Sequence, residues 1–346
     1  MFSSYNYNDK ADRHSFQINK LDLAIINSIR RIILSEIPVV GFYGEEEPTV
    51  DIPFNTGPLH NEFMIHRIGL IPLHVTEIVT DSYEDGDYKF EFNIENKSNE
   101  TINITTADFK GTYKEKELTK QELSKIFPAN KLSKSNILIT RLRPKEHLHV
   151  IATAIKRTGK TNASFSPVSL SNFYFIEDSK QKKDNILDKQ RAYLKDEYGE
   201  PTTINFQIES INGLSYKYLF RKSIDIIIEK LENLIQNLNE DKIPIEAVSS
   251  CENSFNFLIE NEDDTLGNLI QSLLHNKYIR DNKKYKTYDC SYVGYICPHP
   301  LISRLIVRFS LSTDNTKVYK EFFIDNCKEI IKIMEGIRTE WNKFSK

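Results

Sequence analysis

The stretch FQINKLDLAIINSIRRIILSEIP, residues 16–38, determines the fold that we predict. Its first residues alternate as in a short strand, and Asp22 is placed to cap the start of a helix. Pro38 then marks the end of the helix. The apolar positions recur at spacings of three and four residues and share one helical face: Ile25, Ile29, Ile32 and Ile33. The stretch therefore reads as a strand, a cap and an amphipathic helix.

A second stretch, FLIENEDDTLGNLIQS, starts at residue 257 and repeats this pattern. The matching pairs are Phe16 with Phe257, Ile18 with Ile259, Asp22 with Asp263, Asn27 with Asn268 and Ile29 with Ile270. One explanation is that all strand-to-helix starts look alike because they share capping chemistry. The other is that the chain holds two homologous folds, which could meet through their helices around a pseudo-twofold axis.

Two longer helices are predicted, one over residues 215–238 and one at the end of the chain. In both, the apolar positions step by four and three residues, a period of about 3.5 that is typical of helices packed lengthwise on each other. We expect these helices and the two shorter ones to form an intramolecular dimer interface. Its residues are Ile25, Ile29, Phe220, Ile224, Ile227, Leu231, Leu266, Ile270, Phe323, Ile330, Met334 and Ile337.

The fold class that follows is α+β. Two modules, each an antiparallel sheet with two helices, form an intramolecular pseudo-heterodimer, and a mostly β domain is inserted into the first module. We place the first module at residues 1–45 and 204–240, the inserted domain at 46–203, a linker at 241–253 and the second module at 254–346.

Composition and charge exclude several classes of protein. With 346 residues, 39% hydrophobic and 27% charged, the chain has an ordinary globular composition with room for two or three cores. A net charge of −3 gives no sign of a phosphate-binding face, so we expect contact with DNA only indirectly, through a complex. Residues 178–200 are charged with little periodicity and are predicted to form a surface excursion.

The cysteines and the apolar runs exclude further classes. The four cysteines are not paired as CxxC, so we expect neither a zinc site nor a disulfide scaffold. The first residues lack the apolar run of a signal peptide, and no stretch has the roughly 18 apolar residues of a membrane span. We therefore expect no metal, no cofactor and no membrane partner.

Four motifs occur in an order that identifies a family: DLAIINSIRR, HRIGLIPL, DDTLGN and PHPL. The first two resemble the start of the larger α-like subunit of archaeal and eukaryotic multisubunit DNA-directed RNA polymerases, the relative of bacterial alpha. The last two resemble the smaller α-like subunit of the same enzymes. One chain that carries both resembles the fused arrangement of some large DNA viruses.

The resemblance implies a non-catalytic assembly platform. In the family, the paired α-like units hold together the two largest polymerase subunits, join small assembly subunits and contain no catalytic residue. The expected partners are therefore those two large subunits and small polymerase subunits. A viral source would place the chain in the virion and the host cytoplasm, and any other source in the nucleus.

Two charged pairs are candidates for docking the large subunits. Arg30 and Arg31 are neighbours on the first helix and point about 100° apart, so they cannot both face the core. They form either a solvated face or, as the resemblance implies, a docking site whose guanidinium groups suit carboxylates of a partner. His66 and Arg67 either satisfy local hydrogen bonds or also contact a large subunit.

Two other functions remain open from the sequence. The chain could be an interaction scaffold that reuses the fold outside transcription. It could also be an enzyme that works through histidines, but His60, Glu62 and His66 do not have the spacing of a standard metal-binding helix. His147 and His149 share one face of a predicted strand, where histidines are usually surface residues.

Overall fold

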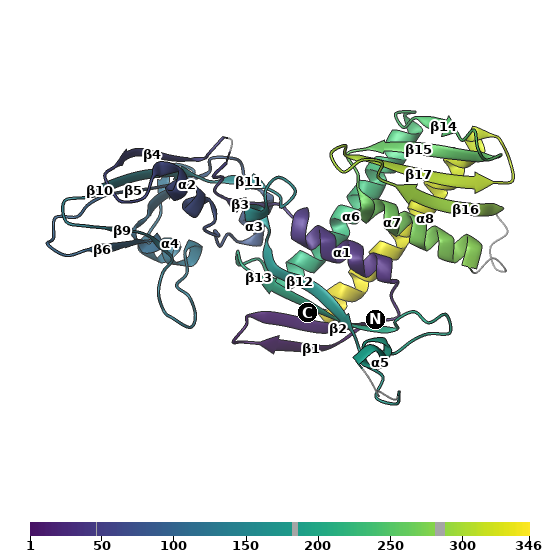
Figure 1. Ribbon diagram of the computed structural model, residues 1–346, viewed down its shortest axis with the longest axis horizontal. Helices are drawn as coiled ribbons and strands as arrows, with labels where there is room; N and C mark the ends of the chain where they lie inside the picture. Colours follow the sequence, from purple (N-terminus) through teal and green to yellow (C-terminus); the bar gives the residue numbers. More distant parts are fainter. Residues whose placement is uncertain (46, 182–185, 281–287) are drawn as a thin grey trace.

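The computed structural model describes residues 1–45, 47–181, 186–280 and 288–346. It is elongated, with the inserted domain at one end and two units of sheet and helices at the other (Figure 1). Every pairing between its strands is antiparallel in the described parts of the chain, so the predicted α+β class is confirmed. The predicted excursion over residues 178–200 lies partly outside the described residues.

The first unit is a four-stranded sheet with two helices on its inner face. Alternate residues of its central strands point into the core, as the period of two predicted for the strand at Phe16 and Ile18 requires. The short helix α5 (Ile186–Arg191) projects from this unit on the side away from the core (Figure 1). The elements, in sheet order and then helices, are β1 (Phe2–Asn8), β2 (Arg13–Asn19), β13 (Thr203–Ser210), β12 (Val168–Phe175), α1 (Leu23–Ser35) and α6 (Tyr216–Asn239).

The second unit repeats this plan with four strands and two main helices, the first of which continues into a π-helical segment. Its first strand comes from the segment predicted to be a linker, which therefore belongs partly to the sheet and is not a free connection. In sheet order the strands are β14 (Ile245–Ala247), β15 (Ser254–Glu260), β17 (Arg304–Leu311) and β16 (Cys290–Ile296), and the helices are α7 (Asp264–Leu274), the π-helical η3 (His275–Arg280) and α8 (Thr316–Phe344).

The inserted domain has a core of its own around a five-stranded sheet. Its sheet strands, in order, are β4 (Val50–Asn55), β10 (His147–Thr153), β5 (Tyr88–Glu95), β7 (Lys110–Tyr113) and β8 (Lys116–Glu117). The remaining elements between α1 and β12 are β3 (Val39–Gly41), α2 (Asn61–Gly69), α3 (Glu77–Asp81), β6 (Ile102–Thr105), η1 (Thr106–Asp108), α4 (Lys120–Ile126), β9 (Leu138–Leu142), β11 (Ile155–Arg157) and η2 (Ala163–Phe165).

The two cores differ from the predicted domain boundaries. The core of the inserted domain begins at Val40 and ends at Ala154, whereas Phe165 and Val168 belong to the core of the first unit. Strand β12 was predicted within the inserted domain, but it pairs with β13 along its whole length. The prediction of 46–203 therefore placed one edge of the first sheet in the wrong domain.

Both shorter helices start as the repeated pattern predicts. The Asp22 carboxylate accepts a hydrogen bond from the amide of Ala24 at 2.8 Å, and the Asp263 carboxylate accepts one from the amide of Thr265 at 2.8 Å. Each satisfies an amide that the first helical turn leaves free. The two copies of the repeat therefore share a strand, an acidic cap and a buried helix.

Gly267 inside α7 is explained by the sheet beneath that helix. A Cβ atom at this position would lie 2.5 Å from Cδ2 of Tyr295 and 2.6 Å from Cδ1 of Leu305. Those side chains belong to β16 and β17, so glycine is needed because the helix lies close to its own sheet.

Candidate assembly interface

The helices α1 and α7 cross between the two units and form the centre of the candidate interface. The Ser28 hydroxyl donates to the carbonyl oxygen of Thr265 at 3.1 Å, and Nε of Arg31 donates to the Thr265 hydroxyl at 2.9 Å. The four residues predicted for this part of the interface are all buried: Ile25, Ile29, Leu266 and Ile270. Side chains from both halves of the chain therefore share one core.

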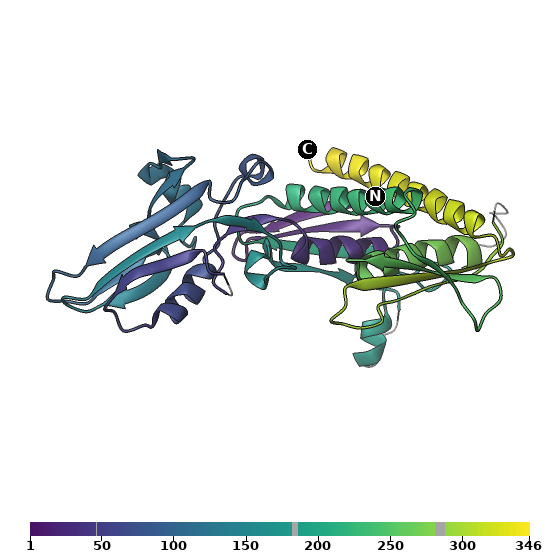
Figure 2. The same ribbon diagram turned by 90° about the horizontal axis from the view of Figure 1, so that it is seen from above.

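The long helices α6 and α8 lie side by side (Figure 2). Arg338 on α8 forms an ion pair with Asp225 on α6 at 2.9 Å. The predicted residues of the two helices are all buried: Phe220, Ile224, Ile227, Leu231, Phe323, Ile330, Met334 and Ile337. The 3.5-residue pattern in each helix thus corresponds to one continuous buried face.

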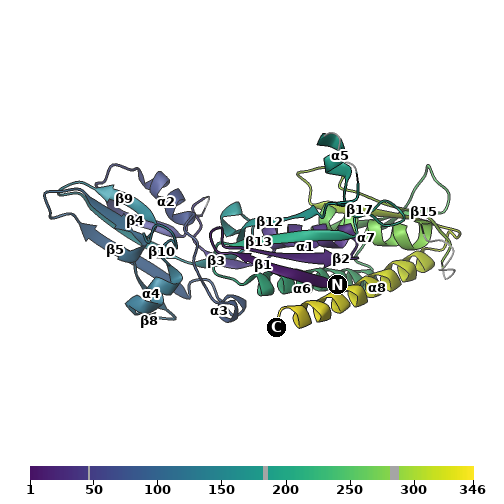
Figure 3. The same cartoon turned by 90° about the horizontal axis from the view of Figure 1, so that it is seen from below.

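Trp341 of α8 belongs to an aromatic cluster of the first unit. Its ring centroid lies 4.2 Å from that of Phe220, 4.9 Å from that of Phe16 and 5.1 Å from that of Phe2. Its indole nitrogen donates to the carbonyl oxygen of Lys217 at 3.0 Å. The first strand and the last helix of the chain therefore meet in this cluster, and Figure 3 shows both ends on the same side of the molecule.

A charged cluster next to the α1 and α7 helices was not predicted from the sequence. The Lys230 ammonium lies 2.8 Å from a carboxylate oxygen of Glu36 and 2.9 Å from one of Glu262. Lys160 lies 3.4 Å from Glu36 and 3.2 Å from Asp263. Glu262 and Asp263 come from the second half and the other three from the first, so the cluster joins the halves through largely buried charges.

The charged cluster shifts the pKa values of its members in different directions. Burial alone would lower the pKa of Lys230, but Glu262 and Glu36 outweigh it and raise that pKa. Burial raises the pKa of Glu262, which shares its lysine with a second carboxylate. Burial would also raise the pKa of Asp263, but hydrogen bonds from Thr265 and the charge of Lys160 lower it to about 2.

Arg30 and Arg31 lie half-buried on α1. Nε of Arg30 donates to Oδ1 of Asn27 at 2.9 Å within the same helix. Burial and the neighbouring charge of Arg31 both lower the pKa of Arg30. In the part of the chain that the structure describes, neither guanidinium has a carboxylate within ion-pair distance.

The other predicted docking pair lies elsewhere. His66 and Arg67 are exposed on α2 of the inserted domain, a helix that the sequence did not predict. Arg67 donates to the carbonyl oxygens of Ile139 at 3.0 Å and Leu138 at 2.9 Å, so it already makes the local hydrogen bonds that we considered as the alternative. The structure therefore does not bring His66 and Arg67 together with Arg30 and Arg31, which lie in a different core unit (Figure 1).

The histidines considered for catalysis do not form a metal site. Across the described ranges, no group of three or more histidine, cysteine and acidic residues could hold a metal ion. His147 hydrogen-bonds Asn93 across two strands of the open sheet face at 2.5 Å. No helix in those ranges combines the length and apolar character needed to cross a bilayer.

Comparison with known families fits this arrangement of two similar units. A family model described as "RNA polymerase Rpb3/Rpb11 dimerisation domain" matches residues 15–231, more than half of the chain, and a second model of the same description matches residues 254–340. The chain belongs to the Rpb3/Rpb11 dimerisation family of RNA polymerase subunits. It carries two such domains, as the internal repeat predicted.

Several relatives of this Rpb3/Rpb11 chain are named as polymerase subunits. Subunit 3 of DNA-directed RNA polymerases II, IV and V from Arabidopsis thaliana is 26% identical over 202 residues, 54% of this chain and 61% of that protein. Subunit RPAC1 of human RNA polymerases I and III is 25% identical over 181 residues, 47% of this chain and 51% of that protein. RPB3 of Schizosaccharomyces pombe RNA polymerase II is 25% identical over 261 residues, 66% of this chain and 84% of that protein.

The chain thus spans only about half to three-fifths of the length of the first two of these relatives.

Proposed function

We propose that this chain is a non-catalytic assembly subunit of a DNA-directed RNA polymerase. Its two α-like halves pair within one polypeptide, and the outer face of that pair docks the two large catalytic subunits, with small assembly subunits as further partners. In a viral source the same proposal places the chain in the virion and host cytoplasm, and in a cellular source in the nucleus.

The observation that carries this proposal is the state of Arg30 and Arg31. Holding a guanidinium group in a half-buried position without a carboxylate costs free energy, which a partner carboxylate would recover. The pair is also absent from the second half, where the repeat places Gln271 and Ser272. A pseudo-symmetric pair of units would therefore present one basic docking face, so that one large subunit can be distinguished from the other.

Affinity purification of the tagged chain from its native source tests this function. We expect the wild-type chain to recover two large polymerase subunits at equal stoichiometry, and Arg30→Glu/Arg31→Glu to lose one or both of them. Arg30→Ala is the milder variant, because among the described residues the Arg30 side chain hydrogen-bonds Asn27 of its own helix, and its loss should leave the fold intact.

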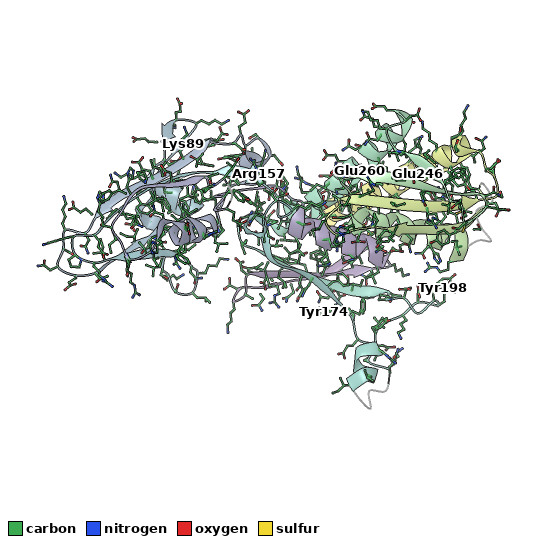
Figure 4. The ribbon with its side chains drawn as sticks, turned by 45° about the horizontal axis from the view of Figure 1, so that its top comes forward. Lys89, Arg157, Tyr174, Tyr198, Glu246 and Glu260 are labelled. Carbon is green, nitrogen blue, oxygen red and sulfur yellow. The ribbon has the colours of Figure 1, made fainter. Side chains whose placement is uncertain are left out.

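The matched control is Lys89→Glu/Lys110→Glu, which makes the same change of charge on the exposed sheet face of the inserted domain, where Lys89 is labelled in Figure 4. The control should recover the subunits at the wild-type level. A wild-type chain that elutes alone, or with proteins outside transcription, would contradict the polymerase function and support a scaffold that reuses the fold.

A further inference from the structure

A cavity of about 810 Å³ opens at the start of α1, between the two halves. One wall is the first turn of α1 from Asp22 to Asn27, and the opposite wall is α7 and η3 with Ser272 and Asn276. The floor is apolar, with Phe173 and Phe175 of β12. The cavity is therefore built from both halves of the chain and exists only when they are paired.

The loop after α5 closes the remaining side of this cavity. Asp196 and Glu200 of this loop line it, and the ring of Tyr198 lies 4.6 Å from the guanidinium of Arg280 in the second half. Tyr198 marks the end of the loop in Figure 4, where it reaches from the first sheet toward the second unit. The loop thus bridges the halves and brings acidic side chains to the cavity.

The charges that line the cavity leave a net negative site. Three carboxylates, those of Asp22, Asp196 and Glu200, line the cavity together with two basic groups, those of Lys20 and Arg280. The Asp22 carboxylate accepts hydrogen bonds from Ala24 and Asn276, and that of Asp196 accepts from two amides of its own loop. Within the described ranges, the Glu200 carboxylate has no ion-pair partner, whereas Arg280 is placed over an aromatic ring. The lining therefore suits a cationic group rather than an anionic one.

The pseudo-twofold repeat shows what occupies the equivalent position at the start of α7. By the alignment that matches Asp22 with Asp263, Ser272 corresponds to Arg31 and Ala24 to Thr265. At the α7 end, Arg31 reaches across and donates to the Thr265 hydroxyl at 2.9 Å. At the α1 end, the Ser272 hydroxyl lies 3.5 Å from the Asp22 carboxylate, and Asn276 donates to that carboxylate at 2.7 Å. The α1 end therefore has shorter, neutral polar side chains where the other end of the helix pair has an arginine.

We propose that this cavity receives a basic side chain, an arginine or a lysine, from the protein that docks on α1. The inference rests on the proposed function in one respect, that the chain works inside a protein assembly. Asn27 both lines the cavity and binds Arg30, so the cavity is continuous with the basic docking face. A partner that fits both sites would carry a basic side chain for the acidic cavity next to an acidic side chain for the basic docking face.

The isolated chain allows a direct test with a small probe. The side-chain amides of Asn27, Asn268 and Asn276 line the cavity and can be followed by NMR after selective labelling of asparagine. We expect N-acetyl-arginine methylamide to shift these three signals, and the neutral N-acetyl-citrulline methylamide to bind at least about tenfold more weakly. Equal shifts with both probes, or none at the solubility limit, would overturn the proposal.

Substitution of Ser272 by arginine fills the cavity from within. Ser272→Arg introduces an arginine at the position of α7 that is equivalent to Arg31 of α1. It should therefore abolish the response to the arginine probe and lower recovery of the large subunits about tenfold or more. Ser272→Ala is its control and should preserve both. A melting temperature near that of the wild type shows that the variant is folded.

Charge reversal on the loop keeps the test independent of Ser272. Asp196→Lys/Glu200→Lys should give the same loss, whereas Glu246→Lys, an exposed acidic position on β14 away from the cavity, should not. Full recovery of the large subunits by Ser272→Arg and by the loop variant would overturn the cavity inference and leave the proposed function intact. A wild-type chain without polymerase partners would instead overturn the proposed function, and the arginine titration would still decide the cavity.

Discussion

The change Trp341→Ala tests whether the two halves are held together by a shared core. Trp341 comes from the second half, is fully buried and contacts Phe2, Phe16 and Phe220 of the first half. Removing a buried aromatic side chain costs about 3–5 kcal/mol through lost transfer free energy and the cavity left behind. The Lys217 carbonyl would also lose its donor, which costs about 1 kcal/mol.

We therefore expect Trp341→Ala to lower the free energy of unfolding by about 4 kcal/mol or more. Urea unfolding followed by far-ultraviolet circular dichroism measures it, since the chain has one tryptophan and the variant loses that fluorescence. In the wild-type chain the same tryptophan reports the contact between the halves directly.

Trp341→Phe is the matched control, because it keeps a ring in the cluster and removes mainly the hydrogen bond. Its cost should be about 1–2 kcal/mol. A loss below about 1 kcal/mol in Trp341→Ala would refute the reasoning, because it would mean that the cluster adds little to the free energy of pairing. Separate unfolding transitions for the two sheet-and-helix units, distinguished from the transition of the inserted domain with its own core, would refute it as well.

Three further predictions concern the α6–α8 contact, the packing of α7 on its own sheet and the charged cluster. Ile227→Asp or Ile330→Asp buries an unpaired charge between α6 and α8 and should cost several kcal/mol in chemical unfolding; unchanged stability in both would exclude this pairing of helices. Gly267→Ala should destabilise by about 1–3 kcal/mol despite its better helix propensity, whereas Gly336→Ala, with open space around it, should stabilise by about 1 kcal/mol in the same melting assay. The pKa of Asp263 is lowered to about 2, so its carboxylate stabilises the folded chain by up to about 2 kcal/mol above pH about 4, and this stabilisation is lost as the pH falls toward 2. Asp263→Asn should therefore reduce the loss of unfolding free energy between pH 4 and 2. An unchanged loss over that range would contradict this role.

The features set by local sequence were the ones that could be predicted. Asp22 and Asp263 cap their helices because capping needs only a carboxylate two residues before a free amide. The buried faces of α6 and α8 follow from the spacing of apolar residues, which is visible in the sequence of each helix alone. The repeat then predicted two similar units without any knowledge of their contacts.

The features that could not be predicted depend on distant parts of the chain. Nothing near β12 tells which of two sheets it joins, because Phe173 and Phe175 would be buried in either. The helix α2 was missed because Phe63, its most prominent apolar residue, is exposed and obscures the helical pattern. The charged cluster was missed because Lys160 and Glu262 are far apart in sequence and meet only when the halves pack.

The meeting of β1 with the end of α8 has a consequence for the order of the two halves. The rings of Phe2 and Phe344 are stacked 5.8 Å apart, so a short peptide could join the two ends of the chain. The backbone would then be a closed ring that could be opened at residues 248–253, between β14 and β15. Such a circular permutant would place the smaller unit first and keep every contact of the interface. The architecture therefore does not dictate which half is translated first.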